Sequence, residues 1–352
     1  MSTTAKTSVL PAALPAPFVN ALKAGQTLEA AGQFTAAIVA YDHARASAHD
    51  ASDAPEWRRQ RGICWMNRGN ALQKIGTSVS VHEAVHAYDQ SIVEFAALPP
   101  EGWPAGRNHL GAAWLNRGHA LIVAGQREAA VLSLENAIAQ LEQLPLADDV
   151  SFRINLAGAW TNLAHVILVD SPVRAVEAAR SALALLNGRE STRPELMEMS
   201  LRARRALVMA LGEQLMAVEK AGESTAELAD EAADAIEAGL NLFRRGEPRG
   251  FERFRALGAR LFRMGAQLYQ LHQPQFLAEF LLEYAECPAF ANDAEFASIA
   301  REAVASGLKK LQQPQLILAG TPAATRLLDT LQALRDAHSR LHRLPALKPL
   351  LS

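Results

Sequence analysis

A glutamate flanked by two histidines, in the segment His82-Glu83-Ala84-Val85-His86, is the residue pattern in this chain most suited to catalytic chemistry. Histidines four residues apart share one face of a helix and can hold a zinc ion, and the intervening glutamate can then activate a metal-bound water, as in zinc peptidases. Glu94 and Glu101 are the candidates for a third ligand. The pattern therefore raises the hypothesis of a zinc metallohydrolase with His82 and His86 as ligands and Glu83 as the base.

The composition of the chain favours helices and excludes several classes of function. The 352 residues are 49% hydrophobic but only 6% aromatic, and the formal net charge is −2. Because no excess of lysine and arginine exists to neutralise phosphates, we expect no nucleic-acid partner. Cys64 and Cys287 are too few for a disulfide framework, which fits a cytoplasmic protein. No apolar run approaches the ~18 residues that a membrane span needs, so we also expect no membrane association.

A short segment recurs along the first half of the chain. Its copies are CWMNRGNAL at 64–72, AWLNRGHAL at 113–121 and AWTNLAHVI at 159–167. At 100° per residue on a helix, Trp114, Gly118 and Leu121 share one face, which we expect to be buried. Glycine on that face would let a second helix come close. The sequence thus predicts that Trp65, Trp114 and Trp160 are buried and aligned along one ridge.

A second helix is expected after each of these segments. Gly125-Gln126-Arg127 leads to Ala130, Leu134 and Ala137, which share one helical face. The equivalent residues of an earlier copy are Ala37, Tyr41 and Ala44. The repeated unit is therefore predicted to be a helical hairpin.

This hairpin resembles the tetratricopeptide repeat (TPR). The best match is formed by Trp114, Asn116, Gly118, Leu121, Gly125, Ala130, Leu134 and Ala137. Residues 20–46, 65–92 and 160–183 match in part, and residues 199–284 match weakly. The tryptophans are farther apart than the family's ~34-residue period, so the repeats are lengthened. The resemblance implies an all-α, right-handed solenoid of antiparallel helix pairs that binds other proteins.

The pattern predicts three regions. Residues 1–17 are expected to form a disordered tail, 18–290 the TPR-like array and 291–352 the capping helices. The last predicted helix starts at Thr321-Pro322 and carries Leu327, Leu331 and Leu334 on one face. We interpret it as part of a cap, with the alternative that it docks a partner or a second copy of the chain as a homo-oligomer.

The resemblance further implies a ligand groove lined by the first helix of each pair. The side chains on the face opposite the tryptophans are predicted to line it: Asn67, Asn70, Lys74, Asn116, His119, Asn162 and His165. Carboxamides both donate and accept hydrogen bonds, which suits an extended peptide backbone. Alternatively, these asparagines tolerate solvent or bond the next helix.

Arginines also recur, at Arg58, Arg107 and Arg153, each seven residues before a tryptophan. They could form an anion-binding row. We favour the alternative, in which their stems pack and their guanidinium groups bond carbonyls at the end of a neighbouring helix. The same interpretation applies to Arg68 and Arg117.

The repeat also decides between the two functional hypotheses. The two histidines fall inside a predicted second helix, where Ala84 and Tyr88 match Ala37 and Tyr41. That register leaves His82 and His86 on the outer face, away from the enclosed pocket that catalysis needs. We therefore predict a non-catalytic peptide-binding scaffold without cofactors, with the zinc metallohydrolase as the alternative; the sequence does not identify the partner.

Overall fold

The computed structural model describes residues 15–47, 54–99, 104–147, 149–189, 193–245, 248–285, 294–311 and 322–341. The predicted tail therefore lies almost entirely outside the described residues. Within these ranges the regular secondary structure is helical throughout. The chain divides into two compact units, a first through Val166 and a second from Ile167.

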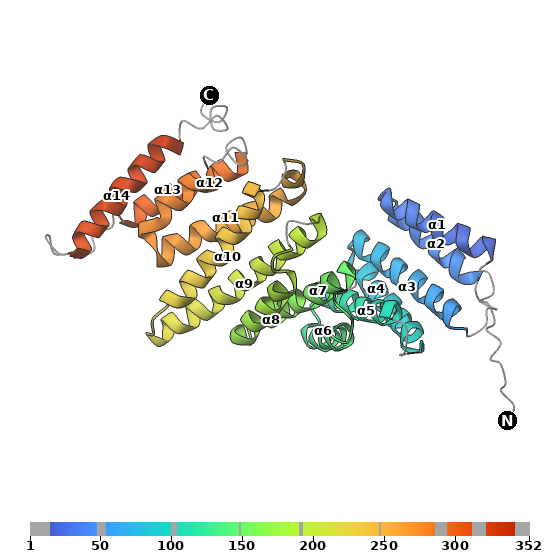
Figure 1. Cartoon of the computed structure of the whole chain (residues 1–352). Helices are drawn as coiled ribbons and strands as arrows, with labels where there is room; N and C mark the ends of the chain where they lie inside the picture. The colour runs from blue at the N-terminus through green and yellow to red at the C-terminus, as the bar shows by residue number, and fades with distance from the viewer. Residues whose placement is uncertain are drawn as a thin grey trace. The chain divides into compact units, whose positions relative to one another are not determined.

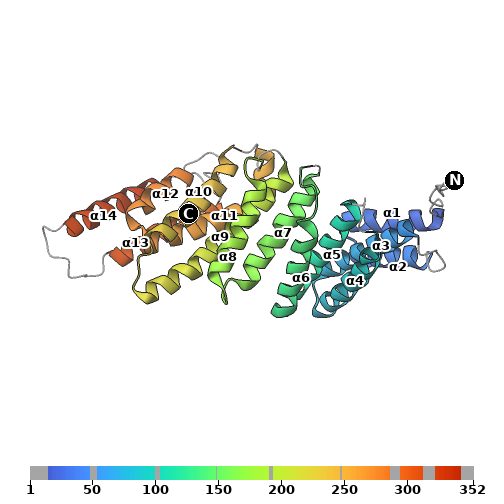
Figure 2. The same cartoon turned by 60° about the horizontal axis from the view of Figure 1, so that its bottom comes forward.

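The first unit is built from antiparallel helix pairs in chain order (Figure 1). Its helices are α1 (Ala16–Ala30), α2 (Phe34–Ala46), α3 (Pro55–Ile75), α4 (Ser78–Ala96), α5 (Pro104–Val123), α6 (Arg127–Leu141) and α7 (Val150–Ile167). Helices α1 and α2, α3 and α4, and α5 and α6 pack as pairs, and α2 also contacts α3, as α4 contacts α5 (Figure 2). The predicted fold class, a TPR-like all-α solenoid, is confirmed by this succession.

Sharp turns join the two helices of a pair. The first helices α3 and α5 are followed by Gly76 and Gly125, both at φ +74°, a left-handed conformation that favours glycine. After Gly76, the Thr77 side chain accepts a hydrogen bond from the Ser80 backbone N–H at 3.1 Å and so caps α4. The left-handed glycines and the Thr77 cap thus account for the turn of the predicted helix–turn–helix unit.

Each pair closes around a glycine on its first helix and a large side chain on its second. A Cβ atom added to Gly118 would lie 2.8 Å from Leu134 Cδ2, and one added to Gly69 would lie 2.6 Å from Tyr88 Cε1. Real Cβ atoms do not approach so closely, so each position requires glycine. Leu134 and Tyr88 are fully buried as a result, which confirms the predicted close approach.

The tryptophans are not part of that core. They were predicted to be buried, and each is only partly buried. Trp65, Trp114 and Trp160 are each partly exposed. The indole of Trp65 lies at the seam between successive pairs, with the Arg45 guanidinium carbon of α2 4.0 Å from its ring centroid. A cation over an aromatic face gains from the ring quadrupole while remaining near solvent. The deep positions belong instead to the second helices, whose Ala37, Tyr41 and Ala44 are fully buried.

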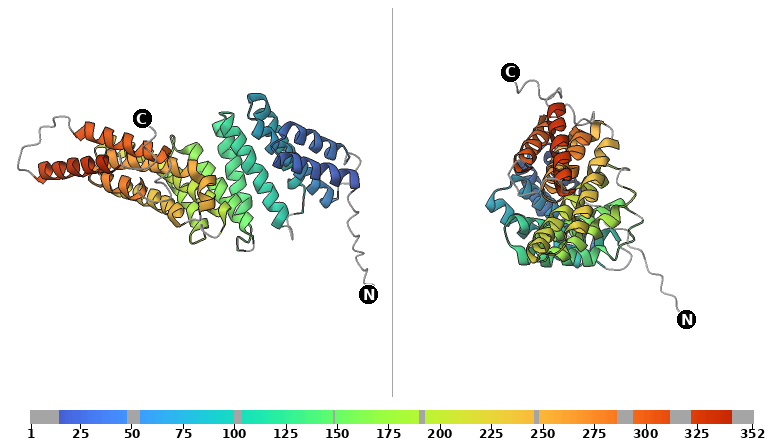
Figure 3. Two further views of the ribbon diagram at one scale, coloured as in Figure 1. Left: turned by 90° about the horizontal axis from the view of Figure 1, so that it is seen from above. Right: turned by 90° about the vertical axis from the view of Figure 1, so that its left-hand side faces the viewer.

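The second unit also packs helices against their neighbours in the chain. Its helices are α8 (Pro172–Leu186), α9 (Pro194–Ala221), α10 (Ala226–Arg245), α11 (Pro248–His272), the short 3₁₀ helix η1 (Pro274–Phe276), α12 (Leu277–Ala285), α13 (Ala294–Leu311) and α14 (Pro322–Leu341). Among them are the two longest helices that the structure describes, α9 and α11. Each of α8, α9, α10 and α13 contacts the helix that follows it, and Figure 3 shows α13 and α14, in orange and red, side by side.

An aromatic cluster forms the core of the second unit. The ring of Phe262 stacks on Phe280 with centroids 5.3 Å apart and also lies 5.3 Å from Phe296. Gly265 repeats the glycine device of the first unit, because a Cβ atom there would lie within 3.0 Å of the Phe280 ring. Aromatic pairs of this kind add stabilisation beyond the area they bury.

The helix predicted to start at Thr321-Pro322 begins at Pro322. Its Leu334 is fully buried, and the nearby Gly307 of α13 would bring a Cβ atom within 3.4 Å of Leu334 Cδ1. The side chains of Leu327 and Leu331 lie outside the described residues. Since Leu334 is used inside its own unit, it is not available for docking a second copy of the chain, and the oligomer alternative loses one of its three leucines.

Candidate functional site: the face of the first helices

The histidine and glutamate side chains of the candidate zinc motif lie on the exposed side of α4. His82, Glu83 and His86 are all exposed. The His82 Nδ1 atom lies 2.8 Å from the Ser78 carbonyl oxygen one turn back, and the His86 ring meets Trp65 edge-on at 6.1 Å. Glu83 lies 3.9 Å from the Arg68 guanidinium. All three side chains thus have local contacts on an open surface.

The proposed third ligands do not complete this motif. Glu94 accepts two hydrogen bonds from Arg61, at 2.8 and 3.1 Å, and lies 3.6 Å from Arg58. Glu101 lies outside the described residues. Among the residues that the structure describes, no three His, Cys, Asp or Glu side chains are grouped so that they could hold a metal ion. The described geometry gives the metallohydrolase alternative no support.

The first helices of successive pairs lie next to one another. Helix α1 contacts α3, and α3 contacts α5. Helices α5 and α7 are joined by a hydrogen bond of 2.9 Å from Asn155 Nδ2 to Asn108 Oδ1. The side of these helices that carries Asn67, Asn116 and Asn162 therefore forms a continuous face across the first unit, which we call the first-helix face.

Two of the predicted groove asparagines are bonded to each other. Asn116 Nδ2 donates to Asn70 Oδ1 at 3.1 Å, and the same oxygen accepts a hydrogen bond of 2.9 Å from the buried Tyr88 hydroxyl. Burial raises the pKa of Tyr88, so its hydroxyl stays protonated and donates. Asn70 is thus held inside the fold and links α3 to both α4 and α5, as the structural alternative for these asparagines expects.

The remaining predicted residues lie on the same face with different degrees of exposure. Asn67 and Asn162 are half-buried, and neither side chain has a hydrogen-bond partner among the described residues. The three charged or titratable members, Lys74, His119 and His165, are exposed. The face therefore combines side chains that serve the fold with polar groups that remain open to solvent.

Gln73 belongs to this face although the sequence pattern did not single it out. Its Nε2 atom donates to the Asn116 carbonyl oxygen at 3.3 Å and lies 3.4 Å from His119 Nδ1. Its Oε1 atom accepts from Tyr88 at 3.2 Å. Only the first copy of the repeat has a glutamine there, so no repeated signal could have revealed it.

The arginines just after the tryptophans join neighbouring pairs. Arg68 Nε donates to Asp42 at 3.1 Å, and Arg117 Nε donates to Asp89 at 2.6 Å. Asp42 and Asp89 follow Tyr41 and Tyr88 directly, so the repeated Tyr-Asp dipeptide was a signal that we missed. The expectation that Arg68 and Arg117 bond helix-end carbonyls is replaced by these ion pairs.

The other recurring arginines are also engaged within the fold. Arg153 Nε donates to the Leu146 carbonyl oxygen at 2.5 Å, which is a carbonyl of the loop between α6 and α7 and not of a helix end as predicted. Arg107 donates instead to the Gln143 side chain, just beyond α6, and Arg58 pairs with Glu94 in the last turn of α4. Since each already has a protein acceptor, an anion-binding row has no support.

The one cysteine that the structure describes as free does not add reactivity to this region. Cys64 is buried in α3, and burial raises the pKa of its thiol to about 12. A thiol that stays protonated at neutral pH is a poor nucleophile. Cys64 therefore acts as a small apolar core residue.

Comparisons with known proteins give a remote likeness of fold. One solved structure is the P58(IPK) TPR domain, which is 11% identical, covers 93% of this chain and 100% of its own, and has a TM-score of 0.21. Another is a circular tandem repeat protein with novel repeat topology and enhanced subunit contact surfaces, at 12% identity, 94% and 91% coverage, and a TM-score of 0.22. No protein-family model matches the chain, and no curated protein matches it. TM-scores this low carry no argument, so the description of the fold rests on the helix pairs themselves.

Within the described part of the chain, none of the helices has the length and apolarity required to cross a bilayer.

Proposed function

We propose that the protein is a non-catalytic scaffold that binds an extended peptide segment of another protein along the first-helix face. The observation that carries this proposal is the pair of half-buried carboxamides on α3 and α7, Asn67 and Asn162, whose hydrogen-bonding groups have no partner among the described residues. Each carboxamide offers two donors and an acceptor, which an extended backbone can satisfy.

The exposed residues of the face would contribute in a second way. Lys74 supplies a positive charge in the last turn of α3, and His119 and His165 supply exposed imidazoles on α5 and α7. Imidazole titrates near neutral pH, so they would add a mild pH dependence to binding. Asn70 and Asn116 would instead hold the face in shape through their mutual hydrogen bond. We place this scaffold in the cytoplasm, in keeping with a buried free thiol at Cys64.

A peptide library displayed on phage and selected against the full chain tests this function. Peptides selected on the wild type should bind the Asn67→Ala/Asn162→Ala variant more weakly. Each lost hydrogen bond is worth ~1 kcal/mol, or roughly fivefold in affinity. The matched control is Asn136→Ala on α6, whose amide only bonds the Leu132 carbonyl of its own helix. Peptides that bind the double variant as tightly as the wild type, or that lose equal affinity with the control, would place the binding site elsewhere.

A further inference from the structure

A cavity of about 520 Å³ opens in the second unit between α10 and α12, with side chains of α11 between them. Ligand sites in proteins commonly fall between ~300 and ~1,000 Å³, so two or three side chains of a peptide would fit. The cavity belongs to a different unit from the first-helix face. An inference about it therefore stands independently of the proposed function.

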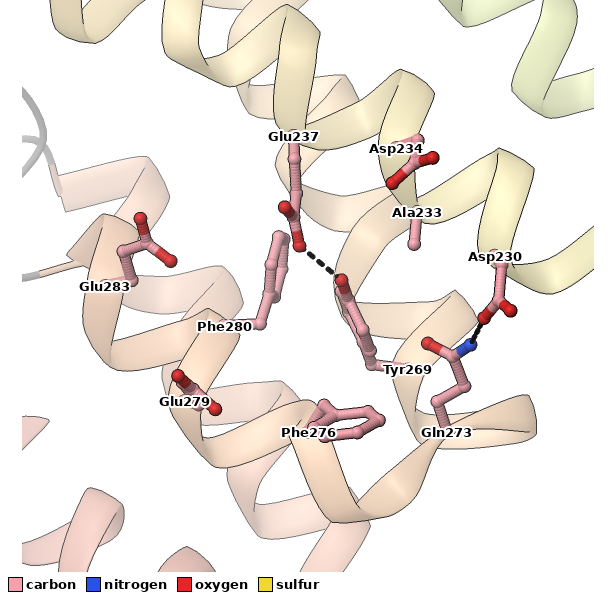
Figure 4. Close-up of a pocket in the computed structure, with 10 residues that line it drawn as sticks. All are labelled: Asp230, Ala233, Asp234, Glu237, Tyr269, Gln273, Phe276, Glu279, Phe280 and Glu283. Atoms are coloured by element: carbon pink, nitrogen blue, oxygen red, sulfur yellow. Dashed lines mark hydrogen bonds between the residues drawn. The ribbon is translucent and has the colours of Figure 1, made fainter.

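Aromatic rings form the walls of this cavity (Figure 4). Tyr269 and Phe280 are buried, with ring centroids 4.8 Å apart. Phe276 differs, because 48% of its surface is exposed. A large aromatic side chain left open beside a cavity offers a flat apolar surface to an incoming group.

Carboxylates surround these rings on two sides. Asp230, Asp234 and Glu237 extend from α10, and Glu279 and Glu283 extend from α12, as Figure 4 shows. No lysine or arginine is among the described residues that line the cavity. Collecting like charges around a concave surface concentrates a negative potential there.

Two of these carboxylates are held in place by neutral donors. The Tyr269 hydroxyl donates to Glu237 Oε1 at 2.5 Å, and Gln273 Nε2 donates to Asp230 Oδ1 at 2.5 Å. Burial, followed by the bond to Glu237, raises the pKa of Tyr269, which keeps this hydroxyl a donor. Because both donors are neutral, neither bond brings a compensating positive charge to Glu237 or Asp230.

Two other carboxylates that line the cavity are exposed to solvent. Asp234 and Glu279 have neither a hydrogen bond nor an ion pair with any other described residue. They come from facing helices, α10 and α12. Figure 4 shows them at opposite ends of the cavity with the rings of Phe280 and Tyr269 between them, so each carboxylate would attract a cationic group of its own.

The chemistry of the cavity distinguishes between kinds of cation. Among the described residues, no three His, Cys, Asp or Glu side chains are grouped so that they could hold a metal ion, which favours an organic cation over a metal ion. A guanidinium group bonds carboxylates in a bidentate manner and stacks on aromatic faces, which an ammonium group does less well. We propose that this cavity binds an arginine-bearing peptide segment of a partner protein, with arginine side chains that pair with Asp234 and Glu279 and stack on Phe276.

The direct test measures binding of a fluorescein-labelled nonapeptide made of three Arg-Leu-Gly triplets to the full chain, by fluorescence anisotropy. The counterpart with glutamate in place of arginine, and free spermine, are the comparison ligands. The Asp234→Asn/Glu279→Gln variant removes two charges and keeps the side-chain shapes. The matched control, Glu219→Gln/Glu227→Gln, removes the same charge from exposed positions of the same unit that do not line the cavity.

We expect the arginine peptide to bind the wild type and the glutamate peptide not to bind. The cavity variant should weaken binding about tenfold or more, and the control variant less than about twofold, because charge-assisted hydrogen bonds exceed screened surface attraction. Phe276→Ala should weaken binding of the arginine peptide about fivefold. Because Phe276 is half-exposed, this variant leaves the core intact.

Three results would overturn the proposal. The first is that the arginine peptide does not bind at about 1 mM. The second is an equal loss of affinity in the cavity and control variants, and the third is that spermine binds as tightly as the peptide. The last result would assign the cavity to a polyamine. The Asn67→Ala/Asn162→Ala variant should leave this binding unchanged, so failure here and failure of the proposed function are separable.

Discussion

The two units use the same device to close a helix pair but surround it with different chemistry. In the first unit, Gly118 admits Leu134, and in the second, Gly265 admits Phe280. Around this contact the first unit has repeated polar links, such as Arg117 with Asp89, whereas the second has stacked aromatic rings. The close contact is thus what defines the fold, and the surrounding residues are free to differ in each unit.

Removing the large partner of each glycine should give the largest effect in both units. Leu134→Ala should lower the free energy of unfolding by ~2–5 kcal/mol and Phe280→Ala by ~3–5 kcal/mol, because each removes a buried side chain that packs against its glycine. Chemical denaturation measures both. Tryptophan fluorescence reports the first unit, since all five tryptophans precede Val166, and circular dichroism reports both units. A loss below ~1 kcal/mol in either variant would mean that the glycine contact does not hold that unit together.

Replacing the glycine by alanine tests the same contact by overcrowding it, whereas the previous variants leave it underpacked. Gly69→Ala should destabilise the first unit by ~1–3 kcal/mol, because the new Cβ atom would lie 2.6 Å from the Tyr88 ring. Gly212→Ala is the matched control in the middle of α9, where a Cβ atom would meet nothing within 4 Å. There the better helix propensity of alanine should stabilise the protein by ~0.5–1 kcal/mol. The same sign in both variants would contradict the comparison.

The polar links between pairs should contribute less than the core. A double-mutant cycle on Asp89→Asn and Arg117→Gln should give a coupling energy of ~0.2–1 kcal/mol, since the Asp89 side chain is 45% exposed. In the second unit, Arg180 and Glu231 join α8 to α10 with the Arg180 side chain 54% exposed. The same cycle there should give a smaller coupling that falls with added salt. A larger coupling for Arg180 and Glu231 would reverse the order predicted here.

The smallest effect is expected at the candidate zinc motif. Glu83→Gln and His82→Ala should each change the free energy of unfolding by less than ~0.5 kcal/mol, because both residues are exposed. Purified protein should hold no stoichiometric zinc by elemental analysis. One zinc ion per chain that is lost in His82→Ala would restore the metallohydrolase hypothesis.

The sequence predicted the helix pairs and the close approach at the glycines, but it missed the repeated Arg–Asp ion pairs and the features that occur only once. Alanines and large apolar residues at helical spacing located the second-helix core, and the glycine positions predicted the close approach. Burial of Trp65 could not be judged from one helix, because its exposure depends on Arg45 of the preceding pair. The aromatic cluster and the acidic cavity of the second unit have no repeated signal. They arise where residues between 230 and 296 come together through tertiary packing.

The central claim is that a peptide binds along the first-helix face, and site-specific photo-crosslinking tests it most directly. A benzoylphenylalanine residue would replace Val123, which lies two turns after Asn116 on the same side of α5, or, as the matched position, Leu132 on α6. The two side chains are 59% and 60% exposed and belong to one helix pair. With a library-selected peptide as the probe, the account predicts crosslinks from position 123 and few from position 132. Crosslinks from position 132 with none from position 123 would contradict it.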